Sequence, residues 1–118
     1  MRAKDAVGRY GEQVAARYLL GEGWQVLDRN WRGSDGELDI VALHDGGLVV
    51  VEVKTRRGLG FGHPAEAVTP RKLARLRRLT AQWLAAHDVH PPSIRIDVIA
   101  VLVPRRGAAR LEHLVGVL

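Results

Sequence analysis

Residues 36–54 read GELDIVALHDGGLVVVEVK, two hydrophobic runs on either side of an Asp-Gly-Gly turn signal. We predict strands over residues 37–44 and 48–55, joined as a β-hairpin. Asp39 lies inside the first run, Glu52 inside the second, and Lys54 follows two residues later. Charged side chains seldom sit inside apolar strands unless a partner or a metal ion uses them. This hairpin therefore carries information on both the fold and the function.

The faces on which these charges lie depend on the register of the hairpin. Side chains alternate along a strand, so Glu52 and Lys54 share a face. A two-residue turn at Gly46-Gly47 pairs Asp39 with Lys54, which brings all three charges onto one patch. A three-residue loop without a bulge would instead turn Asp39 to the opposite face.

The rest of the chain is expected to form two helices and three further strands. A first helix over residues 5–20 ends at a Gly-Glu-Gly segment. Thr69-Pro70 supplies the N-cap and the first-turn proline of a second helix that continues to about His87. The remaining strands are expected over residues 24–31, 94–103 and 111–118. This order indicates an α/β or α+β protein and lacks the βαβ alternation of nucleotide-binding folds.

The first helix is expected to have two apolar surfaces of different kinds. One is a stripe of larger side chains at helical spacing: Val7, Tyr10, Val14 and Tyr18. The other consists of small residues around Glu12, namely Gly8, Gly11, Ala15 and Ala16. Glycine inside a helix is unfavourable, so two of them suggest a close approach to a sheet. Such an approach would bring Glu12 towards the strand charges.

These residue types suit phosphodiester hydrolysis. A divalent cation lowers the pKa of an attacking water and neutralises developing charge, and Mg²⁺ prefers oxygen ligands from one or two carboxylates. Asp39 and Glu52 fit that role, with the Val53 backbone carbonyl and Glu12 as further donors. Lys54 could orient the water or stabilise the charged phosphate.

Structural interpretations of the same residues stay open. An Asp39–Lys54 pair is also compatible with a cross-strand salt bridge, although this leaves Glu52 unexplained. We expect Glu37 to be the solvated end of a strand, with an accessory ligand as the alternative. Asp97, inside an apolar run, is expected to pair with an arginine in a structural role.

Positive charge is concentrated in one block. The chain has 118 residues and a formal net charge of +5, and residues 55–78 carry seven arginines and lysines against one acid, so the remainder sums to about −1. A basic block beside carboxylates suits a phosphodiester substrate, although a solubilising surface is the alternative. The expected phosphate contacts are Arg56, Arg57, Lys72 and Arg75, with Arg32 at the substrate edge.

Composition sets further bounds. There is no cysteine, which excludes disulfides and thiolate metal sites. No apolar run approaches the ~20 residues of a membrane span, and the N-terminal residues lack an apolar signal segment. We expect a single domain over residues 1–118, located in the cytoplasm.

The motifs resemble those of the PD-(D/E)XK nuclease superfamily and, more closely, those of the small bacterial YraN family. The matching segments are Gly8-x-x-Gly11-Glu12, Asn30-Trp31-Arg32, Gly36-Glu37-Leu38-Asp39-Ile40, Val51-Glu52-Val53-Lys54-Thr55-Arg56, Gly62-x-Pro64, Lys72 and Arg95-x-Asp97-Val98. They extend over nearly the whole chain. Leu38 stands where the superfamily name has a proline.

The resemblance implies a restriction endonuclease-like α/β fold: an αβββαβ core with a mixed central sheet flanked by helices, here with an extra C-terminal strand. It puts the superfamily's metal ligands on Asp39 and Glu52, its lysine on Lys54 and its extra helical acid on Glu12. Archaeal Holliday junction resolvases are similar in size and layout, which suggests branched DNA as a substrate by analogy. Symmetric cutting of a junction needs two sites, which is compatible with a homodimer.

The leading hypothesis is a Mg²⁺- or Mn²⁺-dependent DNA endonuclease, structure-specific for branched DNA, in repair or recombination. The alternative is a nucleic-acid-binding module that keeps the nuclease fold without turnover. A third option is a protein-interaction domain.

Overall fold

The structure of the protein is a computed structural model that describes residues 6–58 and 68–117. Gly62 and Pro64 of the motifs above lie outside the described residues. The elements are α1 (Ala6–Gly21), β1 (Gln25–Gly33), β2 (Gly36–His44), β3 (Gly47–Arg57), α2 (Pro70–Ala86), β4 (Ile94–Val103) and β5 (Arg110–Leu114). The expected α/β class and the order αβββαβ with one additional strand are thereby confirmed.

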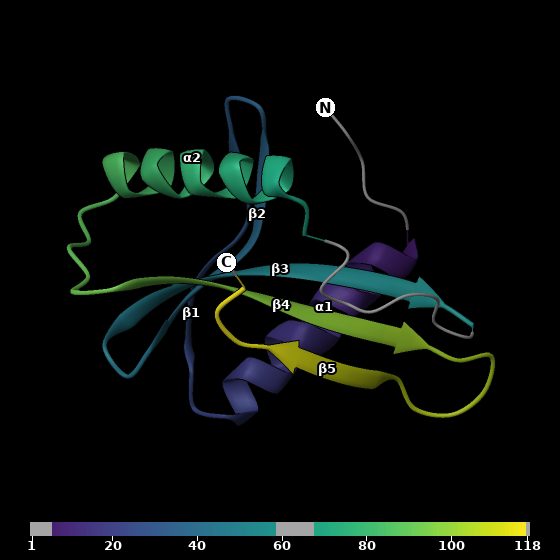
Figure 1. The fold of residues 1–118 in the computed structure, drawn as a ribbon. Helices are drawn as coiled ribbons and strands as arrows, with labels where there is room; N and C mark the ends of the chain where they lie inside the picture. Colours follow the sequence, from purple (N-terminus) through teal and green to yellow (C-terminus); the bar gives the residue numbers. More distant parts are fainter. Residues whose placement is uncertain (1–5, 59–67, 118) are drawn as a thin grey trace.

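The strands form one mixed sheet between two helical layers. Their order is β1-β2-β3-β4-β5, and neighbours are antiparallel except for β3 and β4, which are parallel. Parallel neighbours need a long crossover connection, which contains α2. In Figure 1, α2 lies above the sheet and α1 lies on its other side. The two helices therefore cover opposite faces of the sheet.

Two buried clusters hold the layers together. The cluster under α1 contains Ala15, Ala16, Leu19, Trp24, Ile40, Ala42, Val49, Val51, Ile99 and Val101. The cluster under α2 contains Leu38, Val41, Leu48, Val50, Leu76, Leu79, Trp83 and Ile96. Because β3 contributes alternate residues to both clusters, it is the central buried strand.

The buried face of α1 differs from the predicted apolar stripe. Tyr10 is 45% exposed. The buried residues are Gly11, Glu12, Ala15, Ala16 and Leu19. The reason is the close approach of the helix to the sheet: a Cβ on Gly11 would overlap Thr55 Oγ1 and come within 2.8 Å of Thr55 Cβ. The small-residue surface around Glu12 is therefore confirmed as the packing face, and the predicted role of Tyr10 is wrong.

The hairpin turns one residue earlier than predicted. Its central residues are Asp45 and Gly46, with φ of 50° and 80°, and His44 pairs with Gly47. Positive φ at both positions is typical of a type I′ turn, which Asp-Gly favours. Gly47 instead belongs to β3. A Cβ added to Gly47 would lie 2.5 Å from Ser93 Oγ, so a larger residue would not fit there without a shift of Ser93.

This turn shifts the register, so the predicted pairing of Asp39 with Lys54 is wrong. The ladder between β2 and β3 continues to the pair Ile40–Val51. One further step along the same register leads from Ile40 to Asp39 and from Val51 to Glu52. The turn has the predicted even length, so the shift is by two residues and brings the two carboxylates closer than expected.

The remaining boundaries agree with the sequence to within a few residues. Thr69 Oγ1 accepts a hydrogen bond from the Lys72 backbone N at 3.1 Å, as expected of the N-cap. The strand β4 has the predicted bounds, whereas β5 is shorter than the predicted 111–118. Within the described ranges, neither helix is long and apolar enough to cross a membrane.

Candidate functional site

Asp39 lies where β2 separates from β3. The ladder between the two strands ends at Ile40–Val51. Beyond this pair, the Asp39 side chain replaces the backbone as hydrogen-bond partner of β3: Asp39 Oδ2 accepts a hydrogen bond from the Val53 backbone N at 2.8 Å. The Asp39 side chain is buried. It is therefore held against the β3 backbone next to Glu52.

The regular alternation of side chains between the two faces of β2 is interrupted at Asp39. Leu38 packs in the cluster under α2 and Ile40 in the cluster under α1, although residues two apart share a face in a regular strand. In β1, Asn30 lies opposite Asp39 and has φ of 53°, a conformation uncommon outside glycine. Both strands therefore twist sharply here, and alternation alone does not determine where the Asp39 carboxylate points.

Glu12 reaches this point from the helix layer. The contact between Gly11 and Thr55 brings this turn of α1 against β3, and Glu12 is only 4% exposed. One carboxylate oxygen from each of Glu12, Glu37 and Asp39 lies within 4.8 Å of the others. We call these three residues the acidic group. Like charges at such spacing repel one another, and a bound cation would relieve the repulsion.

Glu37 is the member of the acidic group for which the sequence favoured a solvated strand end. It is half-buried rather than a solvated strand end. The signal for it was its position two residues before Asp39. That signal was ambiguous because the twist between Leu38 and Ile40 decides which side chains converge.

A cleft of about 170 Å³ adjoins the acidic group. Its lining residues are Arg32, Asp35, Gly36, Glu37, Asp39, Glu52 and Arg75. The cleft thus brings Asp39 and Glu52 together. It also puts two arginines beside the carboxylates, so it has groups for both a cation and an anion.

The turn between β1 and β2 is hydrogen-bonded to α2 near this cleft. The Ser34 backbone N donates to Gln82 Oε1 at 3.0 Å, and Gln82 Nε2 donates to Ser34 Oγ at 2.7 Å. Arg78 donates to Asp35 Oδ2 at 2.8 Å, and this hydrogen bond holds the pKa of Asp35 below its usual range. Arg75 is the arginine of α2 that lines the cleft.

The other predicted basic residues do not line the cleft. Lys54 is half-buried in β3 and, within the described part of the chain, is not among the lining residues. Lys72 is half-buried in the first turn of α2, and Arg56 and Arg57 are exposed at the end of β3. The cleft therefore joins Arg32 and Arg75 to the carboxylates and leaves these four basic residues outside.

The donor atoms suit a hard divalent cation. All side-chain donors of the acidic group are carboxylate oxygens, and Glu52 adds another in the adjoining cleft. Mg²⁺ and Mn²⁺ prefer such oxygen ligands, whereas zinc sites usually recruit histidine or cysteine. The residues present therefore fit the expected metal.

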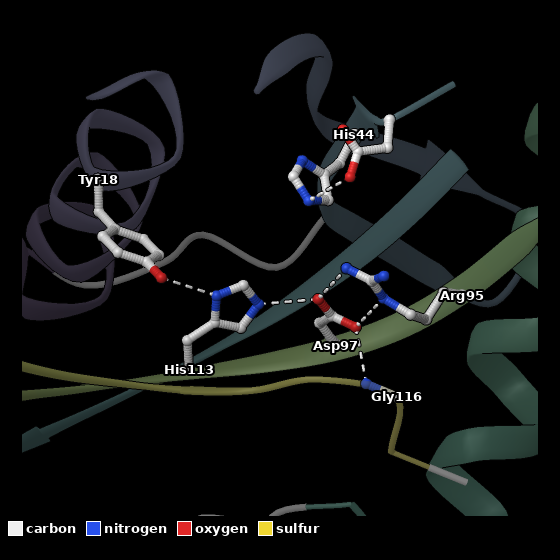
Figure 2. Close-up of polar contacts among 7 residues, drawn as sticks. Tyr18, His44, Arg95, Asp97, His113 and Gly116 are labelled. Atoms are coloured by element: carbon white, nitrogen blue, oxygen red, sulfur yellow. Dashed lines mark hydrogen bonds and ion pairs between the residues drawn. The ribbon is translucent and has the colours of Figure 1, made fainter. Parts of the chain in front are cut away.

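A second polar cluster surrounds Asp97, which is fully buried (Figure 2). Its carboxylate accepts hydrogen bonds from Arg95 Nε at 2.8 Å, from Arg95 Nη2 at 3.1 Å and from the Gly116 backbone N at 2.9 Å. His113 Nε2 lies 2.8 Å from Oδ2, and His113 Nδ1 lies 2.9 Å from the Tyr18 hydroxyl. Burial alone would raise the pKa of Asp97, but these contacts hold it below its usual range. The predicted arginine partner is confirmed, whereas His113 and Tyr18 had no local signal.

The family model and the sequence relatives agree on one family. The family model described as "Uncharacterised protein family UPF0102" matches residues 11–101. A UPF0102 protein from Beutenbergia cavernae is 66% identical over 117 residues, covering 99% of this chain and 99% of the relative. One from Kineococcus radiotolerans is 61% identical over 118 residues, covering 99% of this chain and 97% of the relative.

Among solved structures, a Holliday junction resolvase from Archaeoglobus fulgidus aligns with a TM-score of 0.49 and 18% identity, covering 89% of this chain and 75% of that chain. The family match includes the whole hairpin and the Asp97 segment. The chain belongs to the protein family UPF0102.

Proposed function

We propose that this protein is a divalent-metal-dependent endonuclease that hydrolyses phosphodiester bonds in DNA. The observation that carries the proposal is the cleft lined jointly by Asp39, Glu52 and two arginines, next to the acidic group. Phosphodiester hydrolysis needs carboxylates to hold a cation and positive side chains to hold the phosphate. The cleft combines both in one small volume.

Asp39, Glu52 and Glu12 would hold Mg²⁺ or Mn²⁺, and Glu37 adds a fourth carboxylate. The Val53 carbonyl is a further candidate donor. In a strand the N–H and C=O of one residue point towards the same neighbouring strand, and the Val53 N–H points towards Asp39. When bound, the ion would lower the pKa of the attacking water and neutralise charge on the phosphate.

The basic side chains would act on the water and the substrate. Lys54 lies two residues after Glu52 and shares its strand face, so its ammonium group could donate to the attacking water or a phosphate oxygen. Arg32 and Arg75 would bind non-bridging phosphate oxygens, for which the guanidinium fork is suited.

The size of the cleft limits what part of the substrate it can hold. Its volume of about 170 Å³ is several times the ~30 Å³ that one water occupies in the liquid. It therefore has room for a phosphate group together with an ion. Recognition would then rest on the backbone and shape of the nucleic acid, with Arg56, Arg57 and Lys72 as flanking phosphate contacts.

The experiment compares cleavage of four-way junction, flap, linear duplex and single-stranded DNA with Mg²⁺, Mn²⁺ or a chelator. The resemblance to junction resolvases makes the four-way junction the first substrate to test, and a homodimer would be required for symmetric cuts. We expect metal-dependent cleavage of DNA. An RNA duplex tests whether the substrate class is right.

The key variant is Asp39→Asn. Asparagine keeps an oxygen that can accept from the Val53 N–H but removes the negative charge, so the fold should persist while the rate falls at least about a hundredfold. Asp88→Asn is the matched control, because Asp88 is an exposed carboxylate that does not line the cleft. Cleavage at the wild-type rate by Asp39→Asn would exclude the proposed site.

A binding module without turnover is the second candidate. It is favoured by the position of Lys54, which is outside the cleft lining among the described residues. This candidate predicts salt-sensitive DNA binding that needs no metal, with no cleavage of any substrate. Calorimetric titration with Mn²⁺ separates the two, since Asp39→Asn should weaken metal binding only if the acidic group holds the ion.

A further inference from the structure

A second and larger depression lies away from the carboxylates. It is a groove of about 560 Å³ between α2, the beginning of β4 and the C-terminal segment. Its floor is formed by Leu84 and Ile96, whereas Ala81 and Ile94 are exposed at its edge. Among the described residues, it shares none with the lining of the cleft beside Asp39. The nuclease proposal leaves this groove unused.

The wall of the groove is held by the buried Asp97 cluster. Arg95 and Gly116 both line the groove, and both donate hydrogen bonds to the fully buried Asp97 carboxylate. Figure 2 shows these two donors converging on Asp97 from β4 and from the C-terminal segment. A charge buried with several partners orders its surroundings. These two lining residues are therefore held in place before a ligand binds, which lowers the ordering cost of binding.

Apolar surface is exposed at the edge of this groove. Three apolar lining residues are accessible: Ile94 is 51% exposed, Ala81 is exposed and Leu84 is half-buried. Single exposed apolar side chains are ordinary, but a group of them around a groove is typical of a docking surface.

Charge decides which occupant fits. Arg95 is already paired with Asp97, so Arg77, exposed on α2, supplies the positive charge at the rim. A symmetric dimer through this groove would bring the arginines of both copies to one interface, which like-charge repulsion disfavours. A nucleic acid would present phosphates to an apolar floor, which leaves them without hydrogen bonds.

We propose that the groove binds a peptide segment of a partner protein in which large apolar side chains are flanked by aspartate or glutamate. The apolar side chains would cover Ala81, Leu84 and Ile96, and an acidic side chain would pair with Arg77. Short segments that combine apolar anchors with charged flanks commonly bind preformed grooves in this way.

The test uses the full chain labelled with ¹⁵N and the acetylated peptide Glu-Asp-Leu-Glu-Leu-Leu. We expect saturable shifts of the backbone amides of Thr80, Ala81 and Ile96, while the amides of Asp39 and Glu52 stay unchanged. One comparison peptide replaces the acids by lysine, and another replaces the leucines by serine. Each should bind at least about tenfold more weakly, because each removes one of the two complementary features.

Variants of α2 distinguish binding in the groove from binding elsewhere on the helix. Arg77→Glu should weaken binding of the acidic peptide about tenfold. The matched control is Arg71→Glu, an exposed residue of the same helix that does not line the groove, and it should bind like wild type. Ala81→Trp fills the groove from an exposed position and should also prevent binding. Circular dichroism and urea unfolding verify that each variant is folded.

Three results would overturn the proposal. One is the absence of shifts in the groove at about 1 mM peptide, the weakest affinity that such a contact would need. Another is equal binding by the Arg77→Glu variant. The third is a different occupant: a dimer in sedimentation velocity that Ala81→Trp abolishes, or a DNA duplex that shifts the same amides.

Discussion

Replacing Gly11 by alanine tests the close approach of α1 to the sheet, on which the position of Glu12 depends. In an isolated helix, alanine is about 1 kcal/mol more favourable than glycine. Here the new Cβ would overlap Thr55 Oγ1 and come within 2.8 Å of Thr55 Cβ. Overpacking of this kind costs about 1–3 kcal/mol. We therefore expect Gly11→Ala to lose up to about 2 kcal/mol of unfolding free energy instead of gaining stability.

Gly21→Ala is the matched control, because nothing lies within 4 Å of a Cβ built at Gly21. It should be neutral or more stable by up to about 1 kcal/mol. Urea unfolding followed by tryptophan fluorescence gives both values. Calorimetric titration with Mn²⁺ reports on Glu12, and Gly11→Ala should lower the affinity about tenfold while Gly21→Ala leaves it unchanged. If Gly11→Ala matched Gly21→Ala in stability and bound Mn²⁺ like wild type, the reasoning would be refuted.

The remaining predictions concern the supports of the fold and the phosphate contacts. Asp97→Asn should lose about 1–3 kcal/mol of unfolding free energy at pH 7, because a buried amide accepts weaker hydrogen bonds than a carboxylate from the half-exposed Arg95 and from the Gly116 backbone. The folded-state pKa of Asp97 lies below its usual value. The stabilisation is therefore present above about pH 4 and is lost as the pH falls through the folded pKa. Urea unfolding across this range should show that the unfolding free energy of the variant falls less steeply with decreasing pH. Arg78→Ala should raise the pKa of Asp35 towards its usual value, measured by NMR titration. Gly46→Ala should lose about 1–2 kcal/mol, seen in thermal unfolding, because φ is 80° there. Arg75→Ala should weaken DNA binding and reduce the slope of log K against log salt by about 1.

Each of these predictions has an outcome that would contradict it. An unchanged acid slope in Asp97→Asn would mean that Asp97 is not the group that links folding to pH. An Asp35 pKa that ignores Arg78 would mean that their ion pair does not persist in solution. Full stability of Gly46→Ala would contradict the type I′ turn, and an unchanged salt slope in Arg75→Ala would remove Arg75 from the interface.

The fold could be predicted where neighbouring residues carry the signal. The Thr69-Pro70 cap lies within one turn of the helix it starts, and the run from Ile94 to Val103 defines its strand without reference to other segments. The hairpin register could not be obtained in this way. Both Asp45-Gly46 and Gly46-Gly47 are turn dipeptides, and the distinguishing contact is that of Gly47 with Ser93, far along the chain.

The candidate site could be predicted only in part for the same reason. Asp39 and Glu52 stand out because they are charges inside apolar strands. Glu37 is different, because its place in the acidic group depends on two packing features. One is the twist of β2 at Asp39, and the other is how closely α1 brings Glu12 to the sheet. Such convergence is a property of packing between elements, which no local pattern records.

The proposed function requires that the acidic group and Glu52 hold a divalent metal. A crystal of the protein grown with Mn²⁺ and measured at the manganese absorption edge tests it most directly. The account predicts an anomalous peak about 2.0–2.2 Å from an Asp39 carboxylate oxygen, with Glu52 or Glu12 as a second ligand, and no such peak in Asp39→Asn. The absence of a peak at the acidic group at saturating Mn²⁺, or a peak that persists there in Asp39→Asn, would contradict the proposed metal site.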